Sequence, residues 1–266
     1  MTDSRPAVVL MHGWPVTRLH WRRLAPALAD AGFAVVELDL PGLGAPVPPE
    51  LPDLAKQSLA EWMHDALRRR GLARYAVIGH DWGGTVGTLL AATGPDTVNA
   101  LVIEEEILPG VDVAIPAPGS DHYPSWHGPF NRAAGLAESL VPGRERAYYG
   151  GFLAQSAGPH PLDPQIVDEY VAAYVGEERL AASLSYYRTA EVDARAVRRI
   201  ADDPIRTPVL ALGGEFGMGS AVEEGMRGLA SDVTGRVLPG AGHYPAEQNP
   251  AAVIDAVIPF LSAHAD

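Results

Sequence analysis

The sequence predicts an α/β fold with a mostly parallel sheet and a helical insertion. Short β-branched and apolar runs at residues 7–11, 75–78 and 100–105 are typical of strands that are buried on both faces of a parallel sheet. Segments with helical spacing of apolar residues alternate with these runs, which implies right-handed strand–helix–strand crossovers. The alternation stops after residue 108 and resumes at residue 208. A segment without clear strands is therefore inserted between two parts of one sheet.

The N-terminal part is expected to contain four strands joined by helices. Apolar residues at helical spacing between Thr17 and Ala31 predict the first helix, and Gly32 ends it. The turn at residues 39–44, Asp-Leu-Pro-Gly-Leu-Gly, ends the second strand. In chain order we expect strands at residues 7–11, 33–40, 75–78 and 100–105, and helices at residues 17–31, 57–70 and 85–92.

The middle part is predicted to be helical and the last part to return to the sheet. Pro- and Gly-rich loops separate helical stretches near residues 131–140, 144–154, 164–175 and 177–190. Strands are expected at residues 208–214 and 235–238, with helices at 221–230 and 250–263. We therefore divide the chain into an N-terminal core part (1–108), a helical cap insertion (109–200) and a C-terminal core part (201–266).

The composition of the chain limits the kinds of molecule that it is expected to bind. The 266 residues suffice for one α/β domain with an inserted subdomain. The net charge of −13 argues against nucleic acid and anionic membranes, whose phosphates would be repelled. The absence of Cys excludes disulfides and thiolate metal sites, and no apolar run approaches the ~20 residues that span a bilayer. We expect a cytoplasmic monomer or homodimer that acts on a small molecule without a metal or cofactor.

Gly79-His80-Asp81-Trp82-Gly83-Gly84 carries the strongest functional signal. It joins a predicted strand to a predicted helix, which is the context of a nucleophile elbow with one exposed, strained residue at its centre. That residue is Asp81, and a carboxylate that attacks carbon forms an ester on the enzyme without needing a base. The simpler interpretation is that Asp81 caps the following helix, a common use of Asp.

A water-activating base is needed to hydrolyse such an ester. His243 is the candidate, because its Gly-rich loop follows the last strand and should emerge at the carboxyl edge of the sheet, where α/β sites form. A carboxylate usually orients such a base, and two places supply one: the triplet Glu104-Glu105-Glu106 and Glu215. The triplet would also suit a solvated strand end, but three adjacent carboxylates repel one another, so one should have a cationic partner or a raised pKa.

Two backbone N–H groups are needed to hold an oxyanion. Trp82 follows the nucleophile in the elbow and is expected to provide one of them. Trp14, in the turn His12-Gly13-Trp14-Pro15 after the first strand, is placed to provide the other. A loop merely shaped by Gly13 and Pro15 would show the same residues.

Taken together, these motifs resemble the α/β-hydrolase superfamily and, within it, the epoxide hydrolases. The resemblance covers nearly the whole chain and includes Trp126-His127, Tyr186-Tyr187-Arg188 and Gly242-His243-Tyr244. It is closest to bacterial epoxide hydrolases whose charge-relay acid is a Glu on the strand after the elbow, which maps onto Glu105. The family usually begins with a hairpin before the His-Gly turn, and we expect that hairpin to be missing here, which would leave a strand edge uncovered.

The resemblance also implies an activity. Ring opening leaves an alkoxide, which needs a proton donor, and the family places Tyr or His donors in its cap. Tyr187 matches the family tyrosine and His127 a ring-opening histidine of the Glu-containing subgroup. The expected reaction converts an apolar epoxide into a vicinal diol through an ester on Asp81.

Other functions remain open at this point. A haloalkane dehalogenase shares the Asp nucleophile, but Trp14 stands where several dehalogenases place Asn or Glu. A fluoroacetate dehalogenase would be expected to carry arginines just after the nucleophile, where Trp82 and Thr85 stand here. A non-catalytic ligand-binding homologue is a third alternative, against which the Asp81–His243 pair argues.

Overall fold

The computed structural model describes residues 5–265 and contains one six-stranded sheet in the order β2-β1-β3-β4-β5-β6. Every strand pair is parallel. The strands are β1 (Ala7–Met11), β2 (Ala34–Leu38), β3 (Tyr75–His80), β4 (Val98–Glu104), β5 (Val209–Gly214) and β6 (Val233–Leu238). The predicted α/β fold is confirmed, and the predicted strand positions agree to within two residues at most ends.

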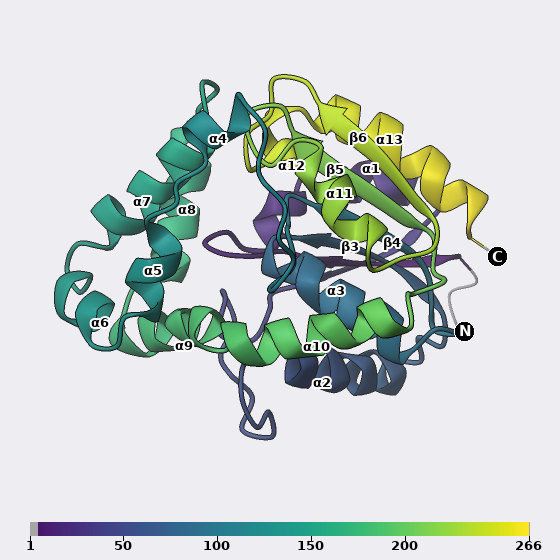
Figure 1. Cartoon of the computed structure of the whole chain (residues 1–266), viewed down its shortest axis with the longest axis horizontal. Coiled ribbons are helices and arrows are strands. Elements are labelled where there is room, and N and C mark those ends of the chain that lie inside the picture. Colours follow the sequence, from purple (N-terminus) through teal and green to yellow (C-terminus); the bar gives the residue numbers. More distant parts are fainter. Residues whose placement is uncertain (1–4, 266) are drawn as a thin grey trace.

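Helices cover both faces of this sheet (Figure 1). On one face α1 (Leu24–Asp30) packs beside α13 (Pro250–Ala263), and both contribute to one buried apolar cluster with alternate strand residues. The other face carries α2 (Lys56–Arg69), α3 (Trp82–Thr93) and α11 (Ala221–Arg227). The four central strands, β1, β3, β4 and β5, are buried on both sides, as their continuous apolar runs predict.

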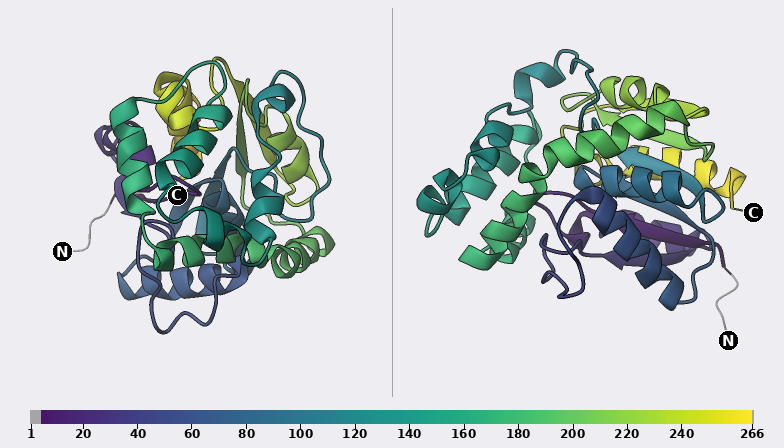
Figure 2. Two further views of the ribbon diagram at one scale, coloured as in Figure 1. Left: turned by 90° about the vertical axis from the view of Figure 1, so that its left-hand side faces the viewer. Right: turned by 60° about the horizontal axis from the view of Figure 1, so that its bottom comes forward.

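The segment between β4 and β5 is helical throughout its regular structure. Its helices α4 to α9 lie beyond one end of the sheet, on the left of Figure 1 and nearest the viewer in the left view of Figure 2. They are α4 (Gly119–His122), α5 (His127–Arg132), α6 (Leu136–Leu140), α7 (Glu145–Ser156), α8 (Pro164–Ala173) and α9 (Glu177–Arg188).

Several helices differ from the sequence prediction. The predicted first helix starts as a 3₁₀ helix, η1 (Arg18–Trp21), and the single helix expected at 131–140 is two short ones, α5 and α6. Helix α10 (Ala190–Asp202) was not predicted; it runs alongside α2 and α3 (Figure 2, right). Ala196, Val197 and Ile200 on one face of the helix are buried, while most of its charged side chains are exposed, so tertiary packing stabilises it. The short α12 (Pro245–Gln248) was also missed.

Strand β2 forms one edge of the sheet and is only half-buried. Within residues 5–265 no strand precedes Ala7, so the family hairpin is absent from the described sheet. None of the described helices has the length and apolar character that crossing a membrane requires.

Candidate active site

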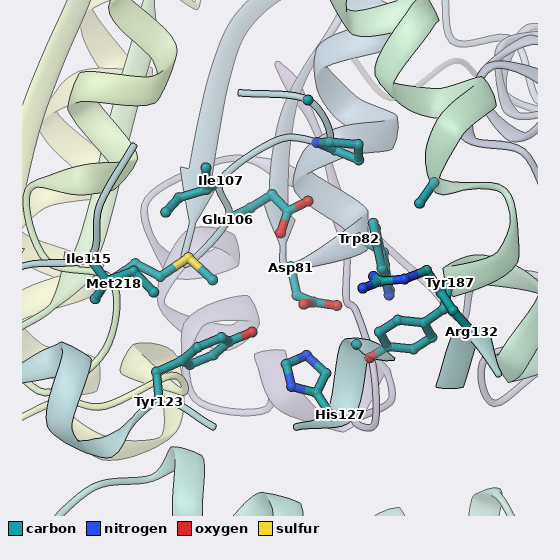
Figure 3. Close-up of a pocket in the computed structure, with 14 residues that line it drawn as sticks. Asp81, Trp82, Glu106, Ile107, Ile115, Tyr123, His127, Arg132, Tyr187 and Met218 are labelled. Carbon is teal, nitrogen blue, oxygen red and sulfur yellow. The ribbon is translucent and has the colours of Figure 1, made fainter. Parts of the chain in front are cut away.

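Asp81 stands at a sharp turn between β3 and α3. Its backbone has φ 50° and ψ −126°, a strained conformation for a residue with a side chain. The turn depends on two glycines: a Cβ on Gly79 would lie 2.3 Å from the Gly83 carbonyl oxygen, and one on Gly83 would lie 2.3 Å from that of Met11. The strand and helix therefore approach as a nucleophile elbow requires, and Asp81 points into a cavity (Figure 3).

The Asp81 carboxylate does not cap the helix. It makes no capping hydrogen bond; instead Oδ1 accepts one from the Trp14 backbone N–H at 2.8 Å. Oδ2 lies 3.6 Å from His243 Nε2. Burial works against ionisation, but the neighbouring His243 outweighs it and lowers the pKa of Asp81. The group is thus held as a carboxylate.

His243 is fixed by its own backbone in the loop after β6. Its N–H donates to the Ser156 carbonyl at 2.9 Å, and its carbonyl accepts from His80 Nε2 at 2.8 Å. Burial disfavours the imidazolium, but the neighbouring carboxylates of Asp81 and Glu105 outweigh it and raise the pKa of His243 to about 9. The ring is therefore positively charged at neutral pH while both carboxylates are ionised.

Glu105 lies directly behind His243. Its Oε2 is 3.0 Å from His243 Nδ1, and its Oε1 accepts from the backbone N–H groups of Gly214 (2.6 Å) and Met218 (2.8 Å). The backbone of Glu105 has φ 54°, which turns the side chain away from the strand direction. A Cβ on Gly217 would lie 2.3 Å from Oε2, so only Gly leaves room for the carboxylate there.

The alternative acid does not reach the histidine. Glu215 is half-buried, and its Oε2 accepts from the Gly240 backbone N–H at 2.8 Å. This bond holds the loop after β6, whereas Glu105 alone of the two contacts His243.

The other two glutamates of the triplet are buried as well, so the triplet is not a solvated strand end. Glu104 Oε1 accepts from the Ala246 backbone N–H at 2.8 Å, and Glu106 accepts from the Thr85 hydroxyl. Burial raises the pKa of each of the three carboxyls, and it does so most strongly for Glu106, where the charge of Asp81 adds to it. The predicted raised pKa therefore applies to all three.

The two predicted oxyanion donors come from different segments, Trp14 from the loop after β1 and Trp82 from the start of α3. The Trp14 N–H already binds Asp81, as given above. Trp82 is the first residue of α3, and N–H groups in the first turn of a helix have no partner within that helix. A cluster of three or more His, Cys, Asp or Glu side chains suited to a metal is not found among residues 5–265.

Residues of the helical segment between β4 and β5, here called the cap side, line the cavity next to Asp81, and two predicted donors are among them. The cavity measures about 380 Å³, within the range of small-molecule sites. Tyr187 from α9 and His127 from α5 both face it (Figure 3). Burial raises the pKa of Tyr187, with the Asp81 charge adding to the effect, so its hydroxyl keeps its proton. Tyr186 points elsewhere: its hydroxyl donates to the Pro41 carbonyl at 2.6 Å.

His127 differs from Tyr187 in protonation. Its Nδ1 lies 2.7 Å from the Pro124 carbonyl oxygen, which can only accept, so Nδ1 carries a proton. Burial lowers the pKa of His127 to about 4, and in the neutral ring Nε2 is left without a proton.

Tyr123 was missed by the sequence analysis. It lines the cavity, its ring centroid is 5.0 Å from that of His243, and its hydroxyl points toward Asp81 (Figure 3). Burial raises the pKa of Tyr123, as does the charge of Asp81, so it too is a neutral O–H donor. It stands in a loop of irregular sequence, where no motif marks it.

Comparison with known proteins identifies the family of the chain. The sequence pattern of the alpha/beta hydrolase fold matches residues 6–250. The chain belongs to the α/β-hydrolase family. The soluble epoxide hydrolase of Corynebacterium sp. (strain C12) is 28% identical over 263 residues, which cover 96% of this chain and 90% of that protein. This α/β hydrolase is therefore an enzyme with epoxide hydrolases among its relatives.

Other relatives of this hydrolase widen the choice of chemistry. A fluoroacetate dehalogenase from Burkholderia sp. is 28% identical over 223 residues, 81% of this chain and 73% of that protein. The crystal structure of Cfl2 from Burkholderia cenocepacia has a TM-score of 0.87 at 29% identity, covering 97% of this chain and 88% of that chain.

Proposed function

We propose that this hydrolase opens an epoxide to a vicinal diol through an ester on Asp81. The observation that carries the proposal is the combination of a carboxylate at the elbow with neutral hydroxyl donors in the cavity wall. Asp81 faces Tyr187 across the cavity (Figure 3). His243 Nε2 lies 3.6 Å from Asp81 Oδ2, and Glu105 contacts the other nitrogen of the ring. A nucleophile, a ring-opening acid and a water-activating base are thus within one small site.

In the first step Asp81 Oδ2 attacks an epoxide carbon. Oδ1 is held by the Trp14 N–H, which leaves Oδ2 as the attacking atom. As the carbon–oxygen bond of the ring breaks, its electron pair goes to the epoxide oxygen, which takes a proton from Tyr187. Tyr123 is a second hydroxyl donor on the other side of Asp81 in Figure 3.

His127 then plays a different part from the one the resemblance implies. At neutral pH its proton is on Nδ1 and is donated to Pro124, so Nε2 can accept but not donate. We propose that His127 accepts a hydrogen bond from a cavity hydroxyl and orients it, and that it acts as a donor only when protonated in acid.

In the second step water hydrolyses the ester. Esterification removes the negative charge of Asp81, one of the two that raise the pKa of His243. The imidazolium then gives up its proton, which restores the Tyr187 hydroxyl. The neutral ring, held by Glu105 through Nδ1, takes a proton from water. The hydroxide attacks the ester carbonyl, whose oxygen would lie between the N–H groups of Trp14 and Trp82. The bond between the ester carbonyl carbon and the substrate oxygen then breaks, His243 returns its proton to that oxygen, and the diol leaves with Asp81 again a carboxylate.

Oxygen-18 labelling tests this scheme. In a single turnover in labelled water, hydrolysis of the ester carbonyl leaves label in Asp81, and mass spectrometry should find it in the peptide that contains this residue. Turnover without label in that peptide would exclude the covalent route. The Asp81→Asn variant, checked for deamidation, is the matched control.

Haloalkane dehalogenation is the second candidate, and one observation favours it. The buried indole nitrogen of Trp82 has no hydrogen-bond partner among the described residues, although it lies near enough to the Tyr187 hydroxyl to lower the pKa of that group. Lys56 Nζ lies 4.1 Å from the Trp82 ring centroid and makes its surroundings more positive. Halide release from bromoalkanes, measured beside diol formation from styrene oxide, separates the two activities.

A further inference from the structure

Glu106 is a buried carboxyl in the cavity wall that the proposed reaction does not use. It follows Glu105 at the end of β4, is 5% exposed, and lines the same cavity as Asp81. Figure 3 shows its carboxyl group directed toward Asp81, with Ile107 and Met218 beside it. A carboxyl group in an apolar wall next to the nucleophile calls for a physical reason, because an ionised one would repel the carboxylate of Asp81.

The surroundings of Glu106 keep it neutral. Burial raises its pKa and the charge of Asp81 raises it further, while the Thr85 hydroxyl, His243 and Lys56 oppose the shift without cancelling it. Tyr123, which also faces it, is itself neutral. The proton can be placed on one oxygen: the Thr85 hydroxyl donates to Oε1, and Oε2 has no hydrogen-bond partner within residues 5–265.

We propose that Glu106 is a specificity-determining residue that donates a hydrogen bond from Oε2 to a second, uncharged oxygen of the substrate. The preferred substrates are then epoxides with a neighbouring ether, hydroxyl or carbonyl oxygen. This inference rests on the proposed epoxide hydrolysis. A donor fixed by Thr85 discriminates well, because a substrate without the acceptor leaves a buried O–H unpaired.

The charges around the cavity disfavour substrates that carry a carboxylate. A substrate carboxylate beside Glu106 would face the negative charge of Asp81. Among the lining residues the one arginine or lysine is Arg132, and its side chain is exposed. Thr85, where the resemblance to fluoroacetate dehalogenases would call for an arginine, donates to Glu106 instead. The deep part of the site therefore suits neutral polar molecules.

A matched substrate pair measures this preference. Phenyl glycidyl ether and 1,2-epoxy-4-phenylbutane differ only by an ether oxygen in place of a methylene, so the ratio of their kcat/KM values reports recognition of that oxygen. Glu106→Leu should lower the ratio roughly 3- to 10-fold, the effect of one lost hydrogen bond. Glu106→Gln keeps an N–H donor, so its ratio should stay close to that of the wild type. An unchanged ratio in Glu106→Leu, with both epoxides still turned over, would overturn the inference.

Further controls separate this inference from the proposed reaction. The wild-type ratio should fall at high pH, as Glu106 ionises, while that of Glu106→Gln stays flat; a wild-type ratio constant with pH contradicts the neutral donor. Infrared difference spectra of wild type against Glu106→Gln should show a protonated carboxyl band that shifts when 3-phenoxy-1,2-propanediol binds. This band tests Glu106 even if Asp81 carries no label, and an absent or unmoved band counts against the inference. Arg132→Gln should leave the ratio unchanged.

Discussion

The two sides of the active-site cavity are built in different ways. On the sheet side, the carboxylates of Asp81 and Glu105 each accept backbone N–H groups at strand ends, and the His243 backbone is bonded in its loop. On the cap side, Tyr187 and Tyr123 are held mainly by ring packing, for example between Tyr187 and Trp14, whose ring centroids are 5.4 Å apart. The sheet side thus holds its catalytic groups by hydrogen bonds, whereas the cap side holds its tyrosine rings mainly by packing.

This difference suggests a division of labour. Enzyme groups that form and break bonds with the substrate or with water need fixed positions, which backbone hydrogen bonds at strand ends provide. Groups that contact the substrate from the cap can vary with substrate shape. Substitutions on the sheet side should therefore stop the reaction, and those on the cap side should slow it or change its selectivity.

The largest effect is expected on the sheet side, at Glu105. Glu105→Gln should lower kcat by about 10³-fold, because the base loses the charge and geometry that orient it, while the ester still forms. Rapid-quench kinetics should show an initial burst of ester followed by slow hydrolysis. Glu215→Gln is the matched control and should change kcat less than about twofold. Equal losses in the two variants would show that orientation of His243 is not the reason.

On the cap side, Tyr187→Phe should slow ester formation by roughly 100-fold, because the epoxide oxygen loses its proton donor. Stopped-flow fluorescence of the nearby Trp82 measures that step directly. Tyr186→Phe removes a hydroxyl that bonds Pro41 outside the cavity and should leave the rate within about threefold. If the two phenylalanine variants behave alike, the cap contributes packing and no proton.

A smaller effect is expected from pH, and it separates the two steps. Ester formation needs ionised Asp81 and protonated Tyr187, so its rate should be constant from about pH 6 to 9, since the pKa of Asp81 is lowered and that of Tyr187 is raised. Hydrolysis needs neutral His243. Its rate should fall about tenfold per pH unit below the pKa that His243 has in the ester form of the enzyme. By NMR, His243 should titrate at a pKa of about 9 in the free enzyme and lower in Asp81→Asn. An unchanged titration there would refute the coupling.

The smallest effect on chemistry is expected where the two sides meet. Lys56 of α2 and Asp193 of α10 form a fully buried ion pair at 3.0 Å. Lys56→Met should lower the free energy of unfolding by about 3 kcal/mol, because it leaves an unpaired buried charge, and adding Asp193→Asn should restore part of the loss. Denaturant titration measures both. Arg146→Met, which breaks an exposed pair with Asp168, should cost less than about 1 kcal/mol.

The same contrast explains what could be predicted from the sequence. Asp81, Glu105 and His243 follow strands, and parallel strands bring their carboxyl ends to one edge, so local motifs sufficed to bring them together. The burial and hydrogen bonding of Glu104 and Glu106 were not predicted, because their partners, Ala246 and Thr85, are distant in sequence.

The cap was harder to predict. Tyr123 lies in a loop, and α10 is recognisable mainly from the helices it packs against. The proton on His127 depends on one carbonyl contact, with Pro124. Packing of this kind leaves no periodic signal in the sequence.

The central claim, that substrate carbon becomes bonded to Asp81, is tested most directly with His243→Gln. This variant retains the nucleophile and the cap donors but lacks the base, so the ester should form and persist. Intact-protein mass spectrometry after mixing with phenyl glycidyl ether should show one added epoxide mass, located on the peptide that contains Asp81. A variant that still binds the diol product yet remains unmodified, or that carries the adduct elsewhere, would contradict the account.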